Sequence, residues 1–362
     1  MNVSIYILGA MMCAQIPAAP SVSPSGAPAS IPSLLAASAP ATVAPATATA
    51  VPVAATPVGG LIAPEDVQDN SVIAPSFAPP VGYAPPPDVF AQETRRLFES
   101  DHAFDGFCEP LSNPVQSKDP RSLTEVRLLF IGDWSRPSTP VIGGGTIQIY
   151  GMQMRLALTE RLQILVENGV FAQVSPKGAR SIFGISNIAP AVKYVFIRDV
   201  ENQFLFSGSL MYSAPTGYPR IFEGHGDGNL AVYGIVGKEF LDKWHFISTF
   251  GQNIALNNST SGYFMTTAHL DRQFGRLFPF YEANWFYYNQ SGRHEPGLGI
   301  EGGGLVNIGA HHVQGLNYVT NAVGVNFKFN QHLIFGVGYE YQLSSRTMLT
   351  NNMLHAQLIL RY

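Results

Sequence analysis

The 362-residue chain has few charged residues, only two cysteines and no long apolar run. Charged residues make up 13% of it, about half of their usual share, and the net charge of −4 offers no basic surface for a nucleic acid. The cysteines, Cys13 and Cys108, are too few for a disulfide framework. The chain has no run of about 18 apolar residues, which is the length that a membrane helix needs. Strands that alternate apolar and polar residues could still cross a membrane without such a run.

The first 94 residues also lack basic side chains, because the first one in the chain is Arg95. Residues 1–20 join a short apolar run to small residues and predict a signal peptide, although no Lys or Arg precedes the run. Residues 21–94 are rich in Ala and Pro, which disfavours helix and sheet. We predict that they form a disordered Pro/Ala-rich tether in the periplasm, with a specific binding tail as the alternative.

The composition changes after this stretch. Residues 88–104 have a short helix-like pattern, and an irregular stretch with three prolines follows. We predict that residues 95–120 form a short periplasmic segment before a sheet domain over 121–362.

From residue 123 onward the apolar residues fall on every second position, which is the period of a strand with two unlike faces. In the closing sequence "LHAQLILRY", for example, Leu354, Leu358 and Tyr362 share one face, and His355 and Arg361 share the other. Twelve such segments occur between 125 and 362. Short and long connections alternate between them, as in membrane barrels with short periplasmic turns and long outer loops. The long ones include 172–186 and 289–320.

The two faces predict two environments. The polar face is expected to point into a lumen and contains Arg127, Asp133, Arg155, Glu167, Lys193, Glu282, Asn284, Lys328, Glu340 and Arg361. Aromatic residues gather towards the strand ends, as expected at two lipid interfaces: Trp134, Tyr150, Tyr194, Trp244, Trp285, Tyr287, Phe327, Tyr341 and Tyr362.

A soluble sandwich would also alternate. Strands of about 9–11 residues, the two aromatic groups and the charges on one face favour a membrane barrel instead. Closure is needed because lipid cannot satisfy an open strand edge. The predicted fold is therefore all-β: a closed antiparallel transmembrane β-barrel of about 12 strands in the outer membrane, with the lipid bilayer as its surroundings.

The closing sequence resembles the C-terminal signal that the barrel assembly machinery reads in bacterial outer-membrane proteins. Within 121–362, the stretches "LTERLQI", "VKYVFIRD", "LMYSAPTG" and "FNQHLIFGVGYEY" resemble the transporter-like outer-membrane family labelled meta-pathway phenol degradation. These are strand-and-turn motifs, so the resemblance implies an architecture and brings no catalytic residue.

No catalytic, cofactor or metal site is predicted. Asp101, His102 and Asp105 could ligate a metal, but a capping or packing role is favoured without a second cluster. His311 and His312 are adjacent and would point to opposite faces. Barrel phospholipases place Ser and His on the lipid face. Here Ser248 lies on that face, whereas His245, His269 and His355 lie on the other, so we do not predict an enzyme.

The leading functional prediction is a passive channel or transporter for a small solute, with hydrophobic or aromatic molecules as candidates, gated by the loop 289–320. A plugged barrel whose interior charges pair with one another is the alternative for the lumen. The alternative function is a structural anchor that links the membrane to peptidoglycan or the cell wall through the tether. A lipid-modifying enzyme is the third possibility.

Overall fold

A computed structural model describes residues 95–362, apart from the side chains of residues 168 and 169. The predicted signal peptide (1–20) and tether (21–94) lie outside the described residues. The helical segments in the described part are two short 3-10 turns, η1 (His102–Phe104) and η2 (Pro219–Ile221). No helix in this part is long and apolar enough to cross a membrane.

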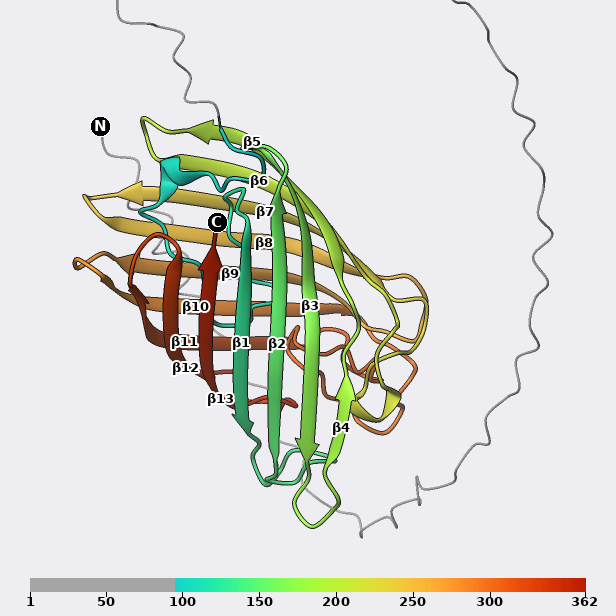
Figure 1. Cartoon of the computed structure of the whole chain (residues 1–362). Coiled ribbons are helices and arrows are strands. Elements are labelled where there is room, and N and C mark those ends of the chain that lie inside the picture. Colours follow the sequence, from blue (N-terminus) through green and yellow to red (C-terminus); the bar gives the residue numbers. More distant parts are fainter. Residues whose placement is uncertain (1–94) are drawn as a thin grey trace, which may run out of the picture. The chain divides into compact units, whose positions relative to one another are not determined.

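The strands form one antiparallel sheet that closes into a ring (Figure 1). Consecutive strands pair, except for β4 and β5, and β1 also pairs with β13, which joins the two ends of the sheet. Both β4 and β5 pair with β3 and share one place in the wall, so the ring has twelve positions, as predicted. The strands are β1 (Glu125–Trp134), β2 (Thr146–Ala157), β3 (Leu162–Ser175), β4 (Ile182–Ile185), β5 (Pro190–Asp199), β6 (Phe204–Ser213), β7 (Asn229–Phe240), β8 (Trp244–Ala255), β9 (Gly262–Arg272), β10 (Leu277–Gln290), β11 (Asn317–Lys328), β12 (Leu333–Gln342) and β13 (Asn352–Arg361).

The barrel has two unlike ends. Short connections such as 241–243 gather at one end, which we call the turn end, and the barrel sequence both enters and leaves there. The longer connections gather at the other end, the loop end, and the longest of them is 291–316.

One expected loop is instead part of the wall. We expected 172–186 to be a long connection, but β3 continues to Ser175 and pairs with β4. The β2–β3 register shifts between Met152 and Met154, which changes the parity of β3 and hides its alternation in the sequence. The ladder on the other side of β3 is also interrupted: it runs with β5 up to Val166 and resumes with β4 at Phe171.

The outer face of the ring is apolar. Large hydrophobic side chains on nearly every strand expose about 40–50% of their surface: Leu128, Tyr150, Met152, Met154, Ile164, Val192, Tyr194, Leu210, Val232, Phe250, Tyr281, Val323, Phe335, Tyr339 and Leu360. Monomeric soluble proteins rarely expose a continuous apolar surface of this size. The outer face therefore requires an apolar environment.

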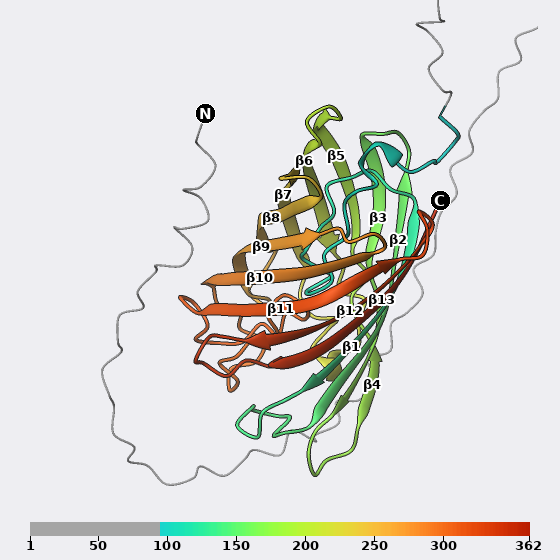
Figure 2. The same ribbon diagram turned by 90° about the vertical axis from the view of Figure 1, so that its left-hand side faces the viewer.

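The segment before β1 lies inside the ring. Figure 2 shows this segment, drawn in teal, running within the ring of strands, and residues 107–123 are all buried. We call residues 104–123 the plug. We predicted 95–120 to be a short segment before the barrel domain, and its residues 107–120 lie inside the ring. The physical reason is that the lumen charges need partners, which the plug supplies.

Two glycines of the wall make room for the plug. A Cβ atom at Gly237 would lie 2.7 Å from the Pro120 side chain, and one at Gly338 would lie 3.0 Å from the Leu111 side chain. Any larger residue at these positions would push the plug away from the wall.

Candidate functional site

The candidate site is the barrel interior. Of the ten residues predicted to face the lumen, all except Lys328 are almost fully buried, and Lys328 is half-buried. Asp133 lies at the loop end, where it accepts hydrogen bonds from the Ser135 hydroxyl (2.8 Å) and from the backbone N–H of Asn351 (2.7 Å). The other nine form the contacts described below.

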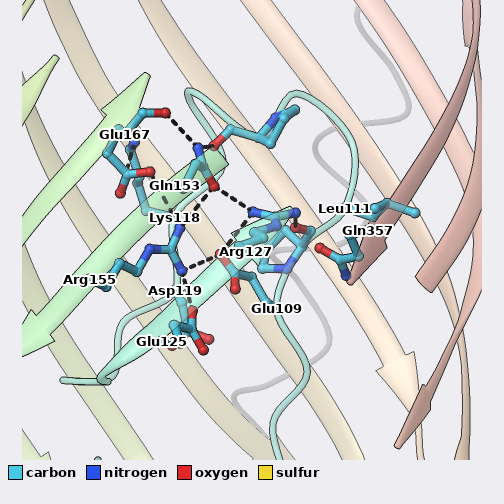
Figure 3. Close-up of polar contacts among 12 residues, drawn as sticks. Glu109, Leu111, Lys118, Asp119, Glu125, Arg127, Gln153, Arg155, Glu167 and Gln357 are labelled. Atoms are coloured by element: carbon cyan, nitrogen blue, oxygen red, sulfur yellow. Dashed lines mark hydrogen bonds and ion pairs between the residues drawn. The ribbon is translucent and has the colours of Figure 1, made fainter. Parts of the chain in front are cut away.

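The largest ionic network surrounds Glu109 of the plug (Figure 3). Its carboxylate accepts from the guanidinium groups of Arg127, at 2.9 Å, and of Arg155. Arg155 also pairs with Glu125, at 2.8 Å, and with Glu167, at 3.4 Å. Buried guanidinium groups are costly without such partners, so the plug completes the charge balance of β1, β2 and β3.

The network extends beyond Arg155 in two directions. Arg361 pairs with the second oxygen of Glu125 at 2.9 Å, which ties β13 to β1. Lys118 of the plug lies 3.4 Å from Glu167.

Two wall lysines bind backbone carbonyl oxygens of the plug. Lys193 donates to the carbonyl of Asp119 at 2.6 Å. Lys328 donates to the carbonyls of Asp105 and Phe107 at 2.7 and 2.8 Å. These contacts need only the backbone path of the plug, so its side-chain composition gave no sign of them.

A second polar cluster lies on β10 to β12. The carboxylate of Glu282 accepts from two consecutive plug amides, Leu111 N–H at 2.7 Å and Ser112 N–H at 2.6 Å. The side-chain amide of Asn284 donates to the Ser112 hydroxyl and to Glu340, at 3.0 and 3.1 Å. This cluster fixes the direction of the plug backbone at residues 111–112.

A chain of hydrogen bonds that the sequence did not reveal supports Glu282. His269 lies between Glu282, at 2.6 Å, and Asp271, at 2.9 Å, and Asp271 also bonds His245 at 2.8 Å. The common strand parity of these residues was visible in the sequence. Their pairing was not, because it depends on the register between β8, β9 and β10.

Above the plug, towards the loop end, the interior becomes apolar. A cavity of about 50 Å³ is lined by β1–β3, by the plug tip and by four loop segments. Its walls include Leu129, Ile131, Val170, Ala172 and Leu305. An engineered apolar cavity of roughly 150 Å³ holds benzene, so this cavity has room for only a small group.

The loop 291–316 closes the interior from the loop end. Its carbonyl groups at Gly303 and Gly304 accept from the plug side chains Asn113 and Gln116, at 2.6 and 3.0 Å. The loop therefore meets the tip of the plug directly. The glycines 302–304 of this loop permit a close approach, since a Cβ at Gly304 would lie 2.9 Å from the Gln116 side chain.

Within this loop, Glu301 is fully buried. It accepts from the Ser261 hydroxyl at 2.6 Å and from the amides of Ile308 and Ala310 at 2.9 Å. Burial raises the pKa of Glu301 to about 7 despite these donors.

The nine aromatics predicted for the lipid interfaces differ in exposure. Trp134, Tyr150, Tyr194, Trp285, Tyr287 and Tyr362 are exposed, whereas Trp244, Phe327 and Tyr341 are half-buried. Trp244 stacks near Phe240, and Arg272 lies over its ring.

The remaining candidates have structural contacts. Asp101 caps η1 by accepting from the Ala103 amide and binds Arg198 with both oxygens, at 2.8 and 2.9 Å. His102 bonds Asp105 at 3.0 Å. The hydroxyl of Ser248 donates to the carbonyl of Thr267, so it is occupied by the neighbouring strand.

Comparisons with known proteins give structural matches alone. No family model and no curated protein matches the chain, so the resemblance to the meta-pathway family stays a prediction. Solved structures similar to this chain include an outer-membrane channel from Pseudomonas putida F1 (TM-score 0.49, 10% identity, 71% of this chain and 100% of that chain). They also include the NanC porin (TM-score 0.44, 7% identity, 66% of this chain and 100% of that chain). A third is the beta domain of the Bordetella autotransporter BrkA (TM-score 0.41, 11% identity, 66% of this chain and 99% of that chain).

Replacing Glu109 with Gln should loosen the plug. The neutral amide leaves Arg127 and Arg155 with one carboxylate fewer, and breaking a buried pair costs about 3–5 kcal/mol. We expect hydrogen exchange of the plug amides to accelerate by roughly a hundredfold or more, measured by mass spectrometry on the full chain. Glu201→Gln, which removes an exposed charge from a short turn, should leave exchange unchanged. Equal rates in both variants would refute the role of Glu109.

Raising the pH through 7 should loosen the loop 291–316. Because the folded state raises the pKa of Glu301 from 4.5 to about 7, its contribution is fully present below pH 4.5 and is lost as the pH rises through 7. The loss is roughly 3 kcal/mol. We expect exchange of the Ile308 and Ala310 amides to rise faster than intrinsic exchange between pH 5 and 7, and to follow intrinsic exchange above about pH 8. Glu301→Gln should abolish this excess, and an excess that persists in the variant would point to another group.

Proposed function

We propose that this protein is an outer-membrane channel that its own N-terminal plug keeps closed, and that its solute is small and apolar. The observation that carries the proposal is the division of the interior. The plug fills the half nearer the turn end through ionic and hydrogen-bonded contacts, and the half nearer the loop end contains an apolar cavity. Polar contacts can be exchanged for water when a plug moves, whereas a hydrophobic core resists hydration.

The orientation follows from the two ends. Short turns face the periplasm in outer-membrane barrels, and long loops face outward. The N–H of Ser100 donates to the carbonyl of Tyr362 at 3.1 Å, so the chain enters the barrel beside its C-terminus, at the turn end. A tether before residue 95 would then begin in the periplasm.

Opening requires movement on both sides of the cavity. The loop 291–316 covers the interior from outside, and the plug blocks it from the periplasm. The two elements touch at Asn113 and Gln116, so displacement of one removes contacts of the other. We infer that solute enters from the loop end and passes by diffusion once both have shifted.

A structural anchor is the second candidate. Its support is the number of wall strands that the plug contacts, from β1 to β11, with buried charges on both sides. Such a plug would hold a periplasmic tether firmly. An anchor needs a permanently closed barrel, whereas a channel must open.

Placing a charge on the outer face should destabilise the protein in a bilayer. Leu128, on β1, exposes 42% of its side chain, and Arg at the middle of a lipid-facing strand costs about 2–4 kcal/mol. We expect Leu128→Arg to lower the unfolding free energy in phospholipid bilayers by this amount. Leu241→Arg, at a turn tip that is 81% exposed, should cost little. If the two variants were equally stable, the outer face would not lie in lipid.

Filling the cavity should reduce uptake. Ala172 lines the cavity, and Leu at this position would occupy the space that the solute needs. The measurement is toluene entry into a Gram-negative host that carries the full chain in its lipopolysaccharide-bearing outer membrane. We expect Ala172→Leu to lower entry several-fold, whereas Val232→Leu on the outer face should not. Entry no faster than in the host alone would reject the channel and favour the anchor.

A further inference from the structure

Glu223 is a buried carboxyl that lacks a cationic partner. It lies in the loop 214–228 between β6 and β7, exposes 6% of its surface and lines the apolar cavity. Among residues 95–362, its hydrogen bond is a long one from the amide of Asn187, at 3.4 Å, and no Lys, Arg or His forms an ion pair with it. Burial raises its pKa to about 8.

The other two buried acids near the cavity and its cover have partners. Glu167 pairs with Lys118 and Arg155, and Glu301 accepts from three donors. An unpaired buried polar group normally costs a few kcal/mol. Glu223 therefore retains a capacity to accept hydrogen bonds that the described protein groups do not use.

The surrounding loop holds this carboxyl in place. The side-chain oxygen of Asn187 accepts from the amides of Gly217 and Gly224, at 2.9 and 3.0 Å, and so ties the two sides of the loop together around Glu223. A Cβ at Gly217 would lie 2.5 Å from the Cβ of Glu223, which shows how closely the loop packs there. A fixed acceptor beside an apolar wall is the arrangement that orients a ligand with one polar end.

We propose that Glu223 accepts a hydrogen bond from the head group of the solute, and that the solutes are small apolar molecules with one alcohol or amine group. The hydrocarbon part would lie against Leu129, Ile131 and Val170, and the donor would reach the carboxyl. This inference rests on the proposed channel function and specifies its substrate class. A polar acceptor favours a solute with a donor over an otherwise equal hydrocarbon such as toluene, whose slower entry then depends on the apolar wall alone.

The test compares benzyl alcohol, benzylamine and toluene, which share one ring and differ in the head group. Their entry is measured in the lipopolysaccharide-bearing host with the full chain and with three variants. Glu223→Leu removes the acceptor, Glu223→Gln keeps a neutral one, and Asp227→Asn changes an exposed acid of the same loop. Heat-modified migration on gels confirms that each variant is folded.

We expect Glu223→Leu to slow entry of the alcohol and the amine by about tenfold and to leave toluene unchanged. Glu223→Gln should retain most of the entry of the alcohol and lose that of the amine, because Gln cannot ionise to pair with an ammonium group. Asp227→Asn should resemble the wild type. If the wild type admits all three probes and Glu223→Leu changes none of them, or all equally, the head-group role is overturned and the channel stands. If the wild type admits none, the channel fails and this inference fails with it.

Discussion

The structure depends on partners for the guanidinium groups of Arg127 and Arg155 inside a closed wall. Both side chains are almost fully buried, and in a space nearly closed to water they need carboxylates within contact distance. The wall provides Glu125 and Glu167, and the plug provides Glu109. An empty lumen would leave these charges to water, whereas the plugged lumen balances them with protein. The plug is therefore part of the folded barrel.

The same constraint separates the two halves of the interior. Towards the turn end, the inward positions of the strands carry charges and amides, and the plug backbone satisfies them. Towards the loop end, the inward positions of β1 to β3 become Leu129, Ile131, Ile147 and Val170. An apolar compartment closed on one side by a plug with polar contacts suits a solute that avoids water. The polar groups that line this compartment include the carboxyls of Glu167 and Glu223.

Much of the wall could be predicted from the sequence, because alternation encodes which face each residue takes. The inward parity of Arg127, Glu282 and Arg361 follows from two-residue steps. The register shift between β2 and β3 changes which residues of β3 face inward, so the two-residue alternation is interrupted. The β3–β4 hairpin therefore could not be predicted from the alternation. The plug could not be predicted, because its chain has no period and most of its contacts use backbone amides and carbonyls. Glu109, Lys118 and Asp119 stood in the sequence as an irregular charged stretch just before β1, which was the one available signal.

Planar-bilayer recording of the full chain, beside its Glu109→Gln variant, measures most directly whether a displaceable plug closes this barrel. The wild type should stay closed with rare, brief openings, and the variant should open more often and for longer at the same voltage. A steady open current in the wild type, equal to that of the variant, would contradict a plug-closed channel, and complete silence in both would contradict a plug that can move.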